Sequence, residues 1–555
     1  MKKALFLLFI ISITLSSCGQ TDSVYNDKLA TTAKIWGFLK YYHPEVGKGK
    51  FNWDDQLFQI LPKIAQAKNK QELSNIYLKW INSLGEIEIC KECTSKENKD
   101  YFGKNFDLTW IKDSTVFSNE LISKLTFIEK NRFQGNNHYV SSFSGVGNIK
   151  IQNEPEYPDF SWENEQLRLL SLFRYWNYIE YFFPYKYQMD KDWDMVLKES
   201  IPNFSNPKSE TDYHLAMLEL IVNINDSHGY FSSNLINDHF GSNFIPAKFQ
   251  IIDKKAIITG FYNERLAKEN DLQIGDVILK VDGKKIETIL NENYKYINGS
   301  NASVKLRNAN ARVFNGSTNS VKITFERNNK IQEKRIQRYP FYQLNFKIYH
   351  KYTYENPIEE KYKILTQNIG YVDMGKVEIE DVSVIMDSLI NTKAIIFDIR
   401  NYPKGTMYSI INYITSKKNA FYKVTYPDLN YPGKFIWREG NQFGKNGKLV
   451  YKGKVILLVN EKTQSHAEFT TMCLQTGENV TTIGSQTSGA DGNVSSIEMV
   501  GGYKTAISGI GIFYPDNTET QRKGVKIDIE IKPTIQGIID GKDEVLEKAI
   551  EYINN

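Results

Sequence analysis

The sequence has a small net charge, few histidines and no cluster of residues with the spacing of metal ligands. In 555 residues, 69 lysines and arginines balance 65 aspartates and glutamates, which leaves a formal net charge of +4. So small an excess over this length does not predict a nucleic-acid partner. The sequence contains no metal-ligand spacing and no glycine-rich phosphate loop, so we expect neither a metal nor another cofactor. The length predicts two to four domains, because a single core rarely serves so long a chain.

Long apolar runs are also scarce, and the one at the N-terminus is typical of a targeting segment. Two lysines precede Ala4 to Leu15, which is short for a membrane span and has the length of a signal-peptide core. Leu15-Ser16-Ser17-Cys18 resembles the lipobox of bacterial lipoproteins, which implies a signal peptide at 1–17 and lipidation of Cys18. An ordinary secretory signal with an incidental cysteine is the alternative. We expect a non-cytoplasmic, lipid-anchored protein of the cell envelope, with the outer membrane favoured.

Cysteine is rare, with 4 in the chain. Cys90 and Cys93 lie in a charged, loop-like stretch, and outside the cytoplasm we expect them to form a local disulfide. Zinc would need further ligands, and a redox site would need a thioredoxin-like context. Cys473 falls in a helical pattern and is interpreted as a small buried apolar residue.

The first half of the chain is duplicated at an offset of 140 residues. Each copy predicts a helix rich in aromatics, a proline-marked turn, a second helix after Trp-Asp and a third, apolar-periodic helix. The third helices are predicted at Glu72 to Leu84 and at Asp212 to Ile224. The matching residues are Trp36, Tyr41, Pro44, Trp53, Asp54, Leu57 and Pro62 in one copy and Trp176, Tyr181, Pro184, Trp193, Asp194, Leu197 and Pro202 in the other. The aromatic residues are interpreted as packing surface.

The two copies differ at their ends. Gly85-Glu86-Ile87-Glu88 ends the first copy, and Asn225-Asp226-Ser227-His228 stands at the corresponding positions of the second. Histidine is the side chain most often used as a general base, and only 7 occur in the chain. His228 is therefore the leading candidate base. A loop histidine with a structural hydrogen bond is the alternative.

Residues 244–338 change character toward short strands and tight turns. Val277 to Val281 is a predicted strand, with Gly275-Asp276 before it and Asp282-Gly283 after it. This arrangement resembles the PDZ signature of peptidase-associated domains, which implies binding of extended peptide at a sheet edge. A β domain that serves only as a spacer is the alternative. The stretch 291–320 is rich in Asn and Ser and is predicted to be a long mobile loop.

From Ile369 onward, strand and helix patterns alternate, which is typical of an open α/β sheet with parallel strands. Such sheets gather functional residues at the C-terminal ends of their strands. Ser465 follows the apolar run Val455 to Val459 and opens a helical segment. A serine on such a strand-to-helix turn has its hydroxyl exposed at the edge of the sheet, close to the first N–H groups of the helix, which have no acceptor within the helix. This is a suitable place for a nucleophile. Ser465-x-x-Glu468 is also a capping-box pattern, in which the serine only caps a helix.

These features together resemble the C-terminal-processing and tricorn-type serine peptidases, over roughly Asp226 to Ile553. The shared motifs are the PDZ-like module, D-I-R-N-x-P-x-G at Asp398–Gly405, S-H-A-E at Ser465–Glu468 and G-S-Q-T-S-G-A-D-G at Gly484–Gly492. The duplication resembles that of lipoprotein members from Bacteroidetes-like bacteria. The resemblance implies a peptidase core of the ClpP/crotonase-like type.

The resemblance also implies which residues carry the chemistry. The processing branch has a lysine where this chain has Ala490, so a Ser-Lys dyad is not expected. The tricorn branch implies Ser465 as nucleophile, His228 as base and Ser227 as the residue that orients its ring. The third, acidic member is placed at Glu519, with Asp516 and Glu468 as alternatives. The implied oxyanion hole consists of the backbone N–H groups of Gly405 and His466, although Lys404 replaces a usual glycine.

We therefore predict a serine endopeptidase that hydrolyses extended polypeptides, peptide or unfolded protein, through an acyl-enzyme. A catalytically inactive PDZ-type scaffold lipoprotein and an ester or cell-wall acyl hydrolase are the alternatives, and the oligomeric state is open. The expected fold is multidomain α+β with a duplicated helical region. Its parts are a lipoprotein signal peptide at 1–17, an N-terminal domain with the first helical repeat at 18–158, the second repeat at 159–240, a PDZ-like β domain at 244–338 and an open α/β core at 339–555.

Overall fold

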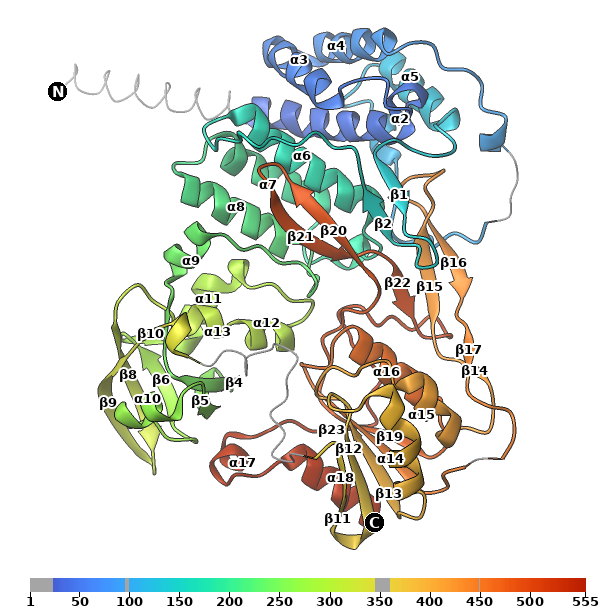
Figure 1. The fold of residues 1–555 in the computed structure, drawn as a ribbon. Coiled ribbons are helices and arrows are strands. Elements are labelled where there is room, and N and C mark those ends of the chain that lie inside the picture. Colours follow the sequence, from blue (N-terminus) through green and yellow to red (C-terminus); the bar gives the residue numbers. More distant parts are fainter. Residues whose placement is uncertain (1–22, 95–98, 345–359, 449) are drawn as a thin grey trace, which may run out of the picture. The chain divides into compact units, whose positions relative to one another are not determined.

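The computed structural model describes residues 23–94, 99–344, 360–448 and 450–555 (Figure 1). The signal segment 1–17 and Cys18 lie outside these residues. The chain divides into two compact units, each described here by itself. The first unit runs to Ile224 and includes the segments 425–437 and 494–510, and the second unit holds the rest from Asn225 onward. Among the described residues, none of the helices is both long enough and apolar enough to cross a bilayer.

Two helical groups with the same pattern make up much of the first unit. The first group has a helix at 23–42, the short α2 (Pro44–Gly47), α3 (Trp53–Gln66) and α4 (Lys70–Ser83). The second group has α6 (Glu165–Phe182), α7 (Trp193–Ser205) and α8 (Glu210–Val222). The helices α3 and α7 each begin at the tryptophan of Trp-Asp, directly after an Asn or Asp cap.

An identical pair of tryptophan contacts stabilises each group. Trp36 Nε1 donates to the carbonyl of Trp53 at 3.0 Å, and Trp53 Nε1 donates back to Trp36 at 3.1 Å. Trp176 and Trp193 make the same exchange at 2.9 and 3.1 Å. All four rings are buried, and a buried indole N–H needs an acceptor. This requirement explains why both tryptophans recur at the 140-residue offset.

Hairpins from distant parts of the sequence complete the first unit. They comprise β1 (Val140–Ser142) with β2 (Ile149–Ile151), and β20 (Val494–Met499) with β21 (Tyr503–Ser508), both antiparallel. The Asn148 side chain donates to the Val494 carbonyl at 3.0 Å, and Ser495 Oγ donates to the Ile149 carbonyl at 2.8 Å. These bonds explain why a C-terminal segment groups with the first unit.

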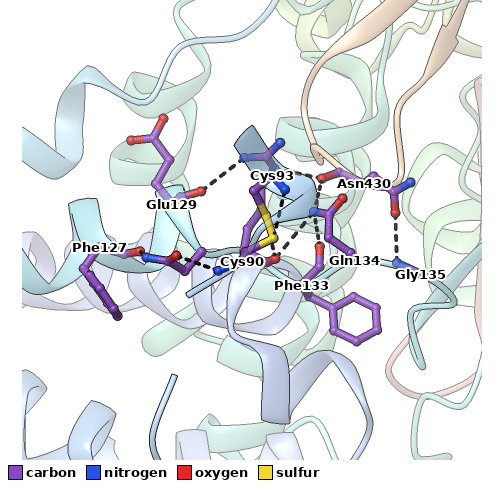
Figure 2. Close-up of a disulfide and its surroundings, with 10 residues drawn as sticks. Cys90, Cys93, Phe127, Glu129, Phe133, Gln134, Gly135 and Asn430 are labelled. Carbon is purple, nitrogen blue, oxygen red and sulfur yellow. Dashed lines mark hydrogen bonds between the residues drawn. A yellow bond between two sulfur atoms is a disulfide. The ribbon is translucent and has the colours of Figure 1, made fainter. Parts of the chain in front are cut away.

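A disulfide joins Cys90 and Cys93 beside the end of α5 (Asn119–Lys130) (Figure 2). The residues after α5 bind the segment 425–437. Gln134 Nε2 donates to the Asn430 carbonyl at 2.9 Å, and Gly135 N donates to the Asn430 side chain at 3.0 Å. The cross-link therefore lies where a C-terminal segment packs on the helical region of the same unit.

The second unit contains a PDZ-like β domain with the strand order β4-β5-β6-β8-β9, and β7 paired to β6. The bounds are β4 (Ala247–Ile252), β5 (Lys255–Phe261), α10 (Glu264–Glu269), β6 (Val277–Val281), β7 (Lys284–Lys285), β8 (Ser320–Arg327) and β9 (Lys330–Gln337). Alternate strand residues such as Phe249, Ile278 and Ile323 form one buried core. The alternation is the pattern expected of a sheet with one solvated face.

The prediction of a long loop at 291–320 is wrong. The first residues of this stretch are the last residues of α11 (Ile286–Asn293). The helices α12 (Ala302–Asn308) and α13 (Asn310–Val313) follow before β8 begins. Asn301 caps α12, because its side chain accepts from Val304 N at 3.1 Å. Asn side chains here cap short helices, which composition alone does not distinguish from loop residues.

The C-terminal part of the second unit is an open six-stranded sheet with the order β11-β12-β13-β18-β19-β23. All neighbours are parallel except β11 with β12. The bounds are β11 (Tyr362–Leu365), β12 (Ile369–Asp373), α14 (Val382–Leu389), β13 (Ala394–Asp398), α15 (Met407–Ile414), β18 (Lys454–Val459), α16 (His466–Leu474), β19 (Val480–Gly484), β23 (Ile529–Glu530), α17 (Ile535–Ile539) and α18 (Glu544–Asn554). Since β13 and β18 are adjacent and parallel, the turns that carry Gly405 and Ser465 leave the same edge of the sheet.

Candidate active site

Ser465 lies on the turn between β18 and α16, in a backbone conformation that non-glycine residues rarely adopt. Its φ is +56° and its ψ is −121°. Its N–H donates to the Ala490 carbonyl at 3.0 Å and to Glu468 Oε2 at 3.2 Å. The capping box of Ser465 and Glu468 is present. Strain of this kind persists only where surrounding bonds enforce it, so the capping box here holds the turn that presents the hydroxyl.

The carboxyl group of Glu468 is the buried anchor of this turn. Its Oε1 accepts from Thr487 Oγ1 at 2.6 Å and from Gly489 N at 2.7 Å, and its Oε2 also accepts from Ala490 N at 3.0 Å. Burial raises the pKa of Glu468, and the donated hydrogen bonds oppose that rise. Burial also raises the pKa of Asp491 well above its ordinary value, and the nearby Glu468 adds to the rise. With both oxygens already bonded, Glu468 serves to hold the turn.

His228 lies on a buried loop of the second unit, beside a carboxylate. Its Nδ1 is 3.5 Å from Asp226 Oδ1, and its backbone N–H donates to the same oxygen at 3.1 Å. The Asp226 side chain is fully buried. A carboxylate at Nδ1 orients an imidazole and leaves Nε2 to accept a proton. Asp226 belongs to the predicted Asp-Ser-His motif, and the sequence alone assigned no role to its carboxylate.

Ser227 fastens this loop to the residues before α12. Its N–H donates to Ser300 Oγ at 2.8 Å, and Ser300 N–H donates back to Ser227 Oγ at 2.9 Å. Asn301 Nδ2 then donates to the Thr487 carbonyl at 2.8 Å and to the Ser488 carbonyl at 3.1 Å. One segment thus connects the histidine loop to the turn that binds Glu468. Ser300 and Asn301 fall in the stretch predicted to be a loop, so no pattern in the sequence marked them as part of the site.

Glu519, the predicted acidic member, lies close to Lys523, with Lys523 Nζ 2.9 Å from Glu519 Oε2. Hydrogen bonds from Thr518 and Lys526 lower the pKa of Asp516, and its side chain is more than half exposed. The assignment of Glu519 stays a prediction. Asp226 is a carboxylate whose proximity to the His228 ring the structure gives directly.

The two residues predicted for the oxyanion hole lie next to each other. Gly405 has a φ of +75°, a conformation that favours glycine, and its N–H donates to His466 Nε2 at 3.2 Å. Burial lowers the pKa of the His466 imidazole. Lys404, the departure from the family pattern, forms an ion pair with Glu378 in which both side chains are half exposed.

Hydrogen bonds between an arginine and two carboxylates hold the turn that leads to Gly405. Arg400 Nη2 donates to Asp398 Oδ2 at 2.6 Å, and Arg400 Nη1 donates to Asp543 Oδ1 at 2.8 Å. Thr463 Oγ1, from the Ser465 turn, donates to the Ile399 carbonyl at 2.7 Å. The D-I-R-N motif therefore holds the glycine turn against the serine turn.

The predicted nucleophile Ser465, the predicted base His228 and Gly405 all belong to the second unit. The arrangement offers a strained serine, a carboxylate-oriented histidine and backbone donors, the parts that acyl transfer requires.

Two segments of the sequence match known families. Residues 368–531 match peptidase family S41, and residues 241–356 match the PDZ domain. The first segment contains Ser465 and Gly405, and the second contains Ser300. No curated protein matches the sequence.

Solved structures share the fold at low sequence identity. Mature CPAF complexed with lactacystin is 13% identical with a TM-score of 0.56, over 70% of this chain and 99% of that chain. A CPAF mutant is 15% identical with a TM-score of 0.57, over 70% and 98% of the two chains. A putative peptidase from Parabacteroides merdae is 14% identical with a TM-score of 0.42, over 70% and 96%. The CPAF likeness shows the fold alone, so the roles of individual residues depend on the geometry above.

Proposed function

We propose that this chain, a serine-type peptidase with an S41 domain and a PDZ domain, cleaves extended polypeptides through an acyl-enzyme on Ser465. The observation that carries the proposal is the strained strand-to-helix turn of Ser465, at the sheet edge it shares with Gly405. Ser465 Oγ attacks the carbonyl carbon while His228 takes the hydroxyl proton and passes it to the leaving amine. Water then hydrolyses the ester. The PDZ domain supports an extended peptide as substrate, since such domains bind peptides by strand addition.

A fluorophosphonate probe tests the nucleophile, and matched substrate panels test the substrate. We expect the probe to label the native chain and not the Ser465→Ala variant, with the labelled peptide containing Ser465. We expect cleavage of unfolded polypeptides and of internal peptide bonds. Hydrolysis of simple esters without any peptide cleavage would favour an acyl hydrolase, and an unlabelled, inactive native chain would favour a peptide-binding scaffold.

The carboxylate that assists His228 can be identified by paired substitutions. Because Asp226 Oδ1 lies 3.5 Å from His228 Nδ1, we expect Asp226→Asn to lower kcat by at least about a hundredfold with little change in KM. Glu519→Gln is the matched substitution at the carboxylate predicted from the sequence. If Glu519→Gln causes the larger loss, the sequence assignment holds and Asp226 has only a structural role.

We also propose that Cys18 carries a lipid anchor, as the lipobox pattern predicts. A doubly acylated cysteine holds a chain at a membrane without spanning it. We expect the full chain in the detergent phase of a bacterial membrane extract and a Cys18→Ser variant outside it. Equal partition of the two would contradict the anchor.

A further inference from the structure

The Gly405 N–H is a predicted oxyanion donor, and in this structure it already donates a hydrogen bond to a side chain of the same protein. The acceptor is Nε2 of His466, the residue directly after the nucleophile, at 3.2 Å. A donor useful in acyl transfer must lie about 2.7–3.1 Å from the position of the oxyanion. One N–H proton makes one strong hydrogen bond, so the imidazole and a substrate oxygen compete for the same group.

The chemistry of the ring suits this role. An imidazole nitrogen accepts a hydrogen bond only when it carries no proton, so the His466 ring is neutral and has its proton on Nδ1. Burial, which lowers the pKa of His466, favours that neutral form. The ring of Tyr402 lies alongside, with its centroid 6.1 Å from that of His466, and is partly exposed. A displaced imidazole therefore has an aromatic neighbour beside which it can lie.

The main-chain N–H of His466 is not affected by this contact. It is the first N–H of α16, which has no acceptor within the helix, and no described residue accepts from it. The neighbouring N–H groups of Ser465 and Ala467 already donate to Ala490 and Gln464. His466 thus supplies one oxyanion donor with its backbone and covers the other with its side chain.

We propose that the His466 imidazole is a latch on the Gly405 half of the oxyanion hole, which substrate must displace before acyl transfer. The inference rests on the proposed function and adds a resting state to it. The opposing interpretation is that the ring holds Gly405 in place for catalysis. The two interpretations predict opposite effects when the ring is removed.

The first experiment compares the native chain with His466→Ala and His466→Gln. Alanine keeps the backbone donor and removes the acceptor, whereas the Gln side-chain oxygen can reach a position close to that of Nε2. We expect the second-order rate of fluorophosphonate labelling at Ser465, and kcat/KM for peptides, to rise about five- to tenfold in His466→Ala. We expect the labelling rate of His466→Gln to be clearly lower than that of His466→Ala, because the Gln oxygen restores an acceptor for the Gly405 N–H. Unchanged or slower reaction of His466→Ala would overturn the latch.

The second experiment measures the hydrogen bond from Gly405 N–H to His466 Nε2 in chains that cannot turn over substrate. Amide hydrogen exchange at Gly405 is measured in the Ser465→Ala background, alone and combined with His466→Ala or His466→Gln. We expect exchange at Gly405 to accelerate at least fivefold with His466→Ala only. Equal exchange in all three chains, with normal labelling of the native Ser465, would overturn the latch alone. Absence of labelling in every chain that keeps Ser465 would contradict the proposed function and the latch with it.

Discussion

Ser465→Ala and His228→Ala are each expected to lower kcat/KM for peptide hydrolysis by at least about a thousandfold. The first removes the atom that forms the ester, and the second removes the group that takes its proton. Combining them should cost little more than either alone, since both residues act in the same step. The measurement is steady-state cleavage of a fluorogenic peptide by purified chains.

His239→Ala is the matched control for this prediction. His239 lies on α9 (Asn234–Phe240) in the same unit, and its side chain is exposed. We expect its activity within about twofold of the native chain, because exposed substitutions rarely disturb a fold. Circular dichroism of all variants should match. Near-native activity in the Ser465→Ala, His228→Ala double variant would show that the nucleophile and base lie elsewhere.

Glu468→Ala is expected to produce the largest loss of stability in the site. The substitution removes the buried acceptor of the Gly489 and Ala490 N–H groups and of the Thr487 hydroxyl, whereas Ser465 N–H keeps the Ala490 carbonyl. Unsatisfied buried donors cost about 1–3 kcal/mol each, so even partial relaxation leaves a loss of about 3 kcal/mol. That loss corresponds to a fall in melting temperature of roughly 5 °C for a unit of this size.

Activity should fall together with stability, because Glu468 holds the Ser465 turn at its strained φ. Glu468→Gln is the control, since it keeps the volume and one acceptor oxygen but turns an amide N–H₂ toward donors. We expect its melting temperature to lie between those of the native and alanine chains, as measured by differential scanning calorimetry. A Glu468→Ala chain with native melting and native activity would contradict the role of the anchor.

The sequence by itself determined the features that depend on neighbouring residues. Apolar periodicity and turn residues located the helices, the PDZ strands and the buried strand before Ser465, because each reflects which face of a short segment is buried. The duplication was visible because the tryptophans of both copies meet the same packing and hydrogen-bonding requirement. The capping box of Ser465 and Glu468 was visible for the same local reason.

Only the tertiary structure decided which of these features meet. The contact of Gly405 with His466 joins residues 61 apart, and Asn301 reaches Thr487 across 186 residues. Such bonds depend on the placement of whole strands and helices, which no local pattern encodes. Asp226 is instructive, because it is only two residues from His228, yet only the loop conformation places its carboxylate at Nδ1. The sequence determined which residues could do the chemistry, and the fold decided which atoms face each other.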